Sequence, residues 1–108
     1  MNALLLIDIQ NDFLPTGNLP VPEGHHVVPI AHQLLPHFDL VIATQDWHPA
    51  HHGSFAVNHP GCKPGEQIAL ADLPQMLWPA HCVANTPGAD LAPGLDRSRI
   101  HHIVRKGT

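Results

Sequence analysis

Three short apolar runs do most to limit how this chain can fold. Ala3 to Ile9 and Leu40 to Thr44 are almost continuously apolar, and His102 to Val104 is a weaker run of the same kind. Runs of this length are typical of strands in a parallel sheet, because such strands need apolar side chains on both faces. We therefore predict three strands at these positions.

The segment between the first two runs has the periodicity of a helix. From Val27 to Phe38 apolar residues recur three or four positions apart. Pro29 fits this helix only in its first turn, where the missing N–H group costs nothing. A strand, a helix and a second strand form a right-handed parallel crossover, so the sequence predicts an α/β fold.

A long irregular segment follows, from Trp47 to about Arg99. It is rich in Pro, Gly, His and Asn, and such an excursion in a small domain is usually functional or disordered. Within this segment we expect one short helix, from Leu70 to Leu77.

Composition argues against several classes of partner. The chain is 44% hydrophobic and 13% charged, which predicts a packed globular protein, and its nine acidic and five basic residues form no basic cluster for nucleic acid. No apolar run is long enough for a signal peptide or a membrane span. The two cysteines, Cys62 and Cys82, are too few for a disulfide framework. We predict a cytoplasmic protein that binds neither nucleic acid nor membranes.

Each predicted strand has a polar residue within two positions of its end: Asp8, Asp46 and Lys106. Ligands of open parallel sheets bind outside the carboxyl ends of the strands, so these side chains meet in one crevice if the strands are neighbours. A lysine and an aspartate that converge there can position and deprotonate a nucleophile. The alternative is an aspartate that caps a turn and a lysine exposed to solvent.

A cluster of potential metal ligands lies in the segment "QDWHPAHHGSF". Asp46, His48 and His52 offer one oxygen and two imidazoles, and His81 is a further candidate. This mixture suits zinc, iron or manganese. The alternative is a chance cluster, because the chain holds eleven histidines. We expect His51 to point away from any site.

Two aromatic residues lie in irregular segments on either side of the predicted crevice. Phe13 and Trp78 could form walls for a flat aromatic substrate. Packing in the core is the alternative interpretation of both residues.

Four motifs, taken together, resemble one known family. They are "LLLIDIQNDFLPTGNLPVPEG", "TQDWHPAHHGSFA", "LWPAHCVANTPGADL" and "VRKGT". The chain is similar to the amino-terminal half of the nicotinamidases, also called pyrazinamidases, of the isochorismatase-like cysteine hydrolase superfamily. "DIQNDF" indicates only the superfamily, whereas "QDWHP" together with "WPAHC" is characteristic of the metal-containing nicotinamidases. The resemblance implies a three-layer αβα fold with a parallel, Rossmann-like sheet.

The resemblance also implies a reaction and a set of roles. The reaction is metal-dependent hydrolysis of nicotinamide, or of pyrazinamide, to the carboxylic acid and ammonia, as part of NAD salvage. The ion would be divalent, with zinc as our choice and iron or manganese as alternatives. The resemblance implies that Asp8 is the general base and Lys106 the catalytic lysine. It implies that Asp46, His48 and His81 are metal ligands and that His52 matches an additional ligand found in some members. Phe13 and Trp78 match the aromatic residues on either side of the substrate ring.

The chain departs from this family in one respect. The family nucleophile is a cysteine well beyond the "RKG" motif, and neither Cys62 nor Cys82 stands at that position. We therefore expect residues 1–108 to form a partial isochorismatase-like hydrolase domain that is inactive alone. Its partner would be a second copy or a complementing carboxy-terminal fragment.

Three other interpretations stay open at this point. They are a related isochorismatase-like amidase with another substrate, a metal-binding module without catalysis, and an enzyme whose metal ion activates water directly.

Overall fold

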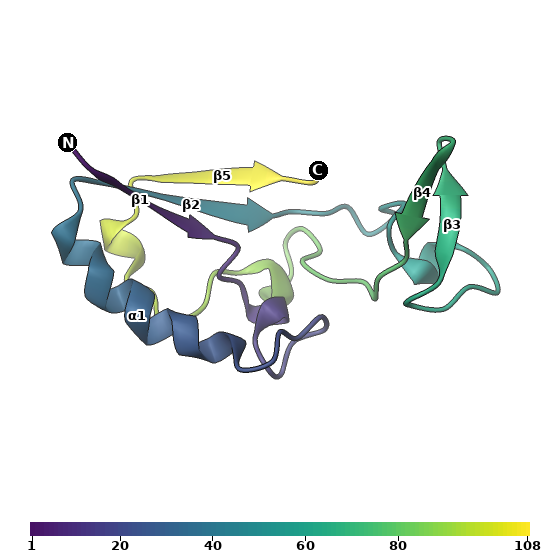
Figure 1. Cartoon of the computed structure of the whole chain (residues 1–108), viewed down its shortest axis with the longest axis horizontal. Helices are drawn as coiled ribbons and strands as arrows, with labels where there is room; N and C mark the ends of the chain where they lie inside the picture. The colour runs from purple at the N-terminus through teal and green to yellow at the C-terminus, as the bar shows by residue number, and fades with distance from the viewer.

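A computed structural model describes residues 1–108 of the chain and contains one main parallel sheet. Its strands are β1 (Ala3–Ile7), β2 (Leu40–Asp46) and β5 (His102–Lys106), with β2 in the centre (Figure 1). The three predicted strands are thus confirmed. The first ends before Ile9, because Asp8 has a φ of 53°, which is incompatible with extended backbone.

One helix packs against one face of this sheet. Short 3₁₀ turns, η2 (Gly24–His26) and η3 (Leu35–His37), flank α1 (Val27–Leu34). Pro29 lies in the first turn of α1, as predicted. The helix is shorter than expected, because Pro36 has no N–H group to continue the α-helical hydrogen bonds. The core between α1 and the sheet consists of Leu6, Ala31, Leu35, Val41, Ala43, Leu91 and Leu95.

The other face of the sheet is not covered within this chain. Side chains alternate along a strand, so Ile7 of β1 points away from the α1 side, and Thr44 and Val104 lie beside it in the same row. Ile7 is 57% exposed and Val104 is 51% exposed. Figure 1 shows α1 below the sheet and no helix above it. The predicted α/β class is confirmed, and we call this surface the uncovered face.

A β-hairpin occupies the place of the short helix expected from Leu70 to Leu77, so that prediction was wrong. The hairpin consists of β3 (Gln67–Leu70) and β4 (Leu73–Met76), and it projects beyond the end of the main sheet (Figure 1). Leucines at helical spacing suggested a helix, but Pro74 would clash with the carbonyl group of Leu70 inside one.

Short 3₁₀ turns and loops make up the rest of the long irregular segment. The turns are η4 (Ala56–Asn58), η5 (Pro87–Ala89) and η6 (Arg97–Arg99), and a further turn, η1 (Asn11–Phe13), follows β1. Backbone hydrogen bonds tie η1 to the region of η5, including Asn11 N–H to Asp90 O at 3.0 Å. The loops therefore hold defined positions beside the strand ends. None of the helices combines the length and the apolar character that a membrane-spanning helix requires.

Candidate active site

The polar groups at the three strand ends lie together. Lys106 Nζ donates to Asp8 Oδ2 at 2.8 Å and to Asp46 Oδ1 at 2.5 Å. This follows from the topology, because parallel strands end at one edge and Asp46 is directly opposite Lys106. Partial burial alone would lower the pKa of Lys106, but hydrogen bonds to the two carboxylates raise it above its ordinary value. The predicted proximity of the three groups is confirmed.

A potential metal-binding group shares Asp46 with this cluster. The ligand atoms of Asp46, His48 and His81 lie within 4.8 Å of one another. Asp46 Oδ2 is 3.6 Å from His48 Nε2. Two ligands of one tetrahedral ion with bonds near 2.1 Å are about 3.4 Å apart, so Asp46 and His48 are already close to that separation. Ligand atoms of the group that are up to 4.8 Å apart must move closer together to share an ion. The donor set of one carboxylate and two imidazoles therefore fits a divalent metal ion.

Backbone carbonyl groups orient both imidazoles toward this position. His48 Nδ1 lies 2.7 Å from Gly107 O, and His81 Nδ1 lies 2.8 Å from Pro79 O. A carbonyl oxygen can only accept, so Nδ1 of each ring carries a proton, and in the neutral tautomer Nε2 has a free lone pair for a metal ion. Histidine ligands of protein-bound metals are usually held in this way.

His52 lies beside the group but has a different hydrogen-bonding pattern. Its ring centroid is 4.5 Å from that of His48. Its Nδ1 accepts the backbone N–H of Ser54 at 3.2 Å, so the neutral ring carries its proton on Nε2. Burial, followed by the charges of His48 and His81, lowers the pKa of His52. His51 is exposed.

Phe55 is a site residue that the sequence analysis missed. Its side chain is fully buried, and its ring centroid lies 5.4 to 5.6 Å from those of His48, His52 and His81. One apolar ring thus supports all three imidazoles. An aromatic residue three positions after His52 was visible in the sequence, but only the folded loop shows its contacts.

Gln10 is a second missed residue. It is fully buried, and its side-chain amide donates to Asp46 O at 2.9 Å while its Oε1 accepts Asp46 N–H at 2.9 Å. Its Nε2 also donates to Ala89 O at 2.9 Å. Because Gln10 satisfies both backbone groups of Asp46, it fixes the end of β2 relative to the turn after β1.

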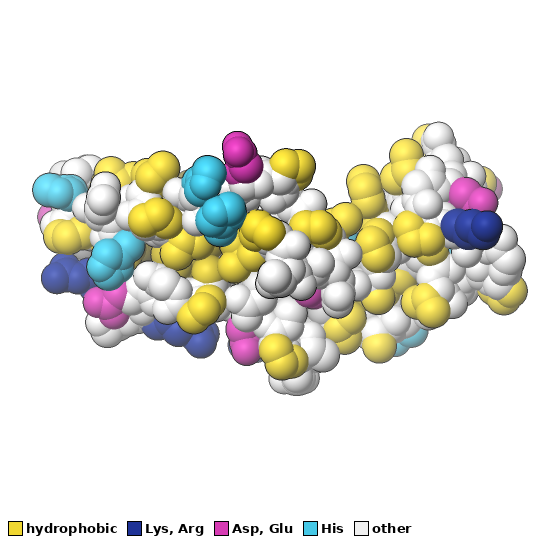
Figure 2. Space-filling view, turned by 90° about the horizontal axis from the view of Figure 1, so that it is seen from below, with side chains coloured by type: hydrophobic (Ala, Val, Ile, Leu, Met, Phe, Trp, Pro, Cys, Tyr) yellow, Lys and Arg dark blue, Asp and Glu magenta, His cyan; other side chains and the backbone are white.

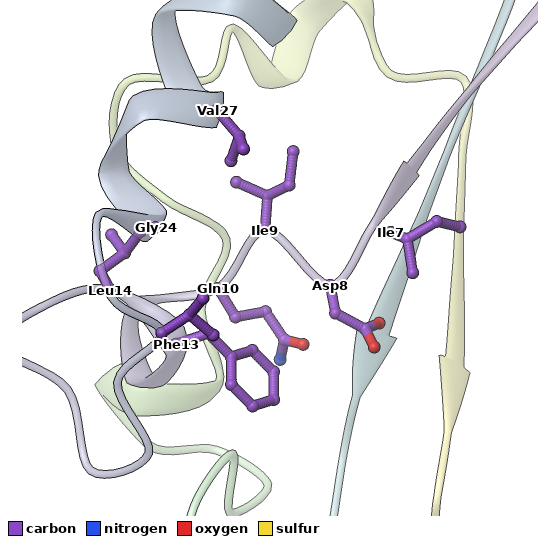
Figure 3. Close-up of a pocket in the computed structure, with 9 residues that line it drawn as sticks. Ile7, Asp8, Ile9, Gln10, Phe13, Leu14, Gly24 and Val27 are labelled. Atoms are coloured by element: carbon purple, nitrogen blue, oxygen red, sulfur yellow. The ribbon is translucent and has the colours of Figure 1, made fainter.

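The two aromatic residues predicted to hold a substrate ring lie on different segments. The Phe13 ring centroid is 5.7 Å from that of His81, and Phe13 lines a cavity of about 340 Å³ together with Asp8 and mainly apolar side chains (Figure 3). Trp78 is 40% exposed and does not line this cavity. Its backbone pairs with Phe55, beside the histidines.

Cys82 is not suited to be a nucleophile. Its side chain is fully buried, and burial, followed by the nearby carboxylates of Asp12, Asp46 and Asp8, raises the pKa of its thiol to about 12. The thiolate, which is the reactive form, is therefore scarce at neutral pH.

Comparison with known proteins places the chain in a family. It matches the Isochorismatase domain over residues 2–108. It is 48% identical over 105 residues to a nicotinamidase from Acinetobacter baylyi and 49% identical over 109 residues to one from Escherichia coli. These matches cover 97% of this chain and 49% and 51% of the two relatives, so the chain spans about half their length.

Solved structures agree with this result. A nicotinamidase and pyrazinamidase from Acinetobacter baumanii is 46% identical with a TM-score of 0.91, and the match covers 97% of this chain and 51% of that one. The pyrazinamidase of Pyrococcus horikoshii in complex with zinc is 37% identical with a TM-score of 0.72, covering 98% and 51% of the two chains. Because the family match extends over residues 2–108, this chain belongs to the isochorismatase domain family.

Proposed function

We propose that this chain supplies the acid–base and metal-binding part of a nicotinamidase, which hydrolyses nicotinamide, and also pyrazinamide, to the carboxylic acid and ammonia. One observation carries the proposal: Lys106 contacts Asp8 and Asp46 at once, and Asp46 also belongs to the group with His48 and His81. The acid–base pair and the potential ligands therefore form one cluster. The identities of 48% and 49% to nicotinamidases support it.

The chemistry starts from the Asp8 carboxylate. Asp8 is the general base that takes the proton of a cysteine thiol, and Lys106 stabilises the resulting thiolate by its positive charge. The sulfur attacks the amide carbon, and ammonia leaves with a proton that Asp8 returns. Water then cleaves the thioester while Asp8 takes its proton, which regenerates the thiol. In this proposal the cysteine is contributed by residues outside 1–108. Residues 1–108 are therefore one part of the hydrolase domain.

Asp46, His48 and His81 would hold a divalent metal ion, and His52 is an additional ligand only if its ring changes its hydrogen bonds. We propose zinc, which the related Pyrococcus horikoshii structure contains, with iron or manganese as alternatives for the same donors. A bound ion would supply a Lewis-acidic position for the ring nitrogen of nicotinamide. Phe13 and Trp78 would limit the movement of that ring by contacts with its faces.

Zinc uptake by the 108-residue chain tests the ligand assignment. We expect D46A, H48A and H81A each to abolish uptake in isothermal titration calorimetry, because each removes a donor. H51A is the matched control, since it removes an exposed histidine from the same loop and leaves uptake unchanged. Undiminished binding by H48A, or an equal loss in H51A, would contradict the assignment.

Release of ammonia from nicotinamide tests the mechanism with the same zinc-loaded chain. We expect no turnover, because the thiol nucleophile is not among residues 1–108. Turnover by this chain alone would instead favour a metal-activated water. The partner, either a second copy or a complementing fragment, and the cytoplasmic location stay predictions from the sequence.

A further inference from the structure

The backbone of Asp8 adopts a conformation that is uncommon for residues other than glycine. Its φ is 53°, in the left-handed region that residues with a Cβ atom seldom occupy. The Asp8 carbonyl group accepts Gln10 N–H at 2.9 Å, so the chain turns sharply at this point. Such a conformation persists only where neighbouring groups hold it.

One side chain of the neighbouring strand holds Asp8 at two points. Asp8 N–H donates to Thr44 Oγ1 at 3.1 Å, and the Thr44 hydroxyl donates to Asp8 Oδ1 at 2.6 Å. Thr44 can do this because it is opposite Ile7 in the sheet and its side chain is on the uncovered face. A single hydroxyl group therefore fixes both the backbone and the carboxylate of Asp8.

We propose that Thr44 is a positioning residue for the general base, acting through Asp8. With Oδ1 held by Thr44 and Oδ2 held by Lys106, the plane of the carboxylate is fixed from both sides. This role in catalysis rests on the proposed function, whereas the contact between Thr44 and Asp8 does not. A hydroxyl group is required, because it must accept from an N–H and donate to a carboxylate at the same time.

Three substitutions separate the hydroxyl group from the shape of the threonine side chain. T44V keeps the branched shape and loses the hydroxyl group, T44A loses both, and T44S keeps the hydroxyl group. The measurement is NMR of the metal-free chain: hydrogen exchange of the Asp8 amide, the coupling constant that reports its φ, and the chemical shift of its carboxyl carbon. The Asp46 amide, which donates a hydrogen bond to the Gln10 side chain and not to Thr44, is an internal reference.

We expect Asp8 amide exchange to be roughly tenfold faster in T44V, as loss of one hydrogen bond would produce. The φ-dependent coupling and the carboxyl shift should change with it, while T44S stays close to wild type and the Asp46 amide is unaffected. Unchanged Asp8 signals in T44V, or a loss in T44S as large as that in T44V, would overturn the proposal. If T44V does not fold, T44A and T44S give the same comparison.

These measurements require neither metal nor turnover. If they show no effect of T44V on Asp8, Thr44 is not a positioning residue, and the proposal of a nicotinamidase is unaffected. Conversely, absence of zinc uptake would undermine the proposed function and leave the contact between Thr44 and Asp8 intact.

Discussion

Lys106 is the residue that joins the two carboxylates of the cluster. Without its ammonium group, Asp8 and Asp46 would present two negative charges at one strand edge with no cation between them. Lys106 is partly exposed, so water screens these ion pairs and their contribution to stability is modest. The contribution of these ion pairs to stability nevertheless depends on pH in a defined way.

We predict that the ion pairs of Lys106 are lost in alkali. Because the folded-state pKa is raised above the ordinary value of 10.5, their contribution is complete below that pH and disappears as the pH rises through the folded-state pKa. The free energy of unfolding should therefore fall above about pH 10.5, and the fall should be smaller in K106M. Urea unfolding at a series of pH values measures it. K63M, which removes an exposed lysine elsewhere, should behave like wild type.

The residues that the sequence revealed and those that it concealed differ in a physical way. Asp8, Asp46 and Lys106 were visible because each is next to an apolar run, and parallel strands bring such ends together. Thr44 and Gln10 were not visible, because their roles depend on the register of the strands and on the path of the turn after β1. Phe55 depends on the fold of an irregular loop.

At the scale of elements, the hairpin of β3 and β4 has a strained turn. Its two central residues, Ala71 and Asp72, have φ values of 50° and 64°. Two-residue hairpin turns favour this conformation because it matches the twist of the strands, and glycine or asparagine usually supplies it. Alanine adopts it at a cost, because its Cβ atom crowds the backbone.

We predict that A71G strengthens the hairpin. Removing the Cβ atom should stabilise it by about 0.5 to 1 kcal/mol, since the relief of strain exceeds the added flexibility of glycine. Native-state hydrogen exchange of the β3 and β4 amides gives the local free energy of opening. A69G is the control, because Ala69 lies in extended β3 and its replacement should weaken the hairpin. Weakening by both changes would show that strain at Ala71 is negligible.

The elements of the main sheet were predictable, whereas the hairpin was not. Each main strand is a continuous apolar run, which periodicity detects, and α1 has a clear helical period up to Pro36. The segment from Leu70 to Leu77 has leucines at helical spacing as well. Pro74 and the turn at Ala71 and Asp72 make this segment a hairpin and not a helix. Because that turn contains no glycine, the sequence shows no recognisable turn signal.

At the scale of the whole molecule, apolar side chains are exposed on both sides. The uncovered face presents Leu5 and Ile7, at 58% and 57% exposure, and α1 presents Ile30 at 56%. Figure 2, seen from the side on which α1 lies, shows apolar side chains spread between histidines. Monomeric proteins seldom leave apolar areas of this kind in water.

We predict that the isolated chain binds hydrophobic dyes and self-associates through the uncovered face. L5K should reduce dye fluorescence and shift sedimentation toward the monomer, because a charge in the middle of this face is costly to bury. V57K is the control, since Val57 is 76% exposed but lies outside the sheet. Equal effects of L5K and V57K would show that dye binding and self-association do not depend on the uncovered face.

The contact between His48 and Gly107 connects the loop after β2 with the residue that follows β5. Gly107 has a φ of 68°, and a Cβ atom there would lie 2.4 Å from the His48 ring, so this close approach requires glycine. If occupation of the histidine site is favoured by this contact, reciprocity requires that a bound cation stabilise the contact by the same free energy. Local unfolding of β5 and release of the ion would then be one coupled equilibrium, and a chelator would loosen a strand that provides no ligand.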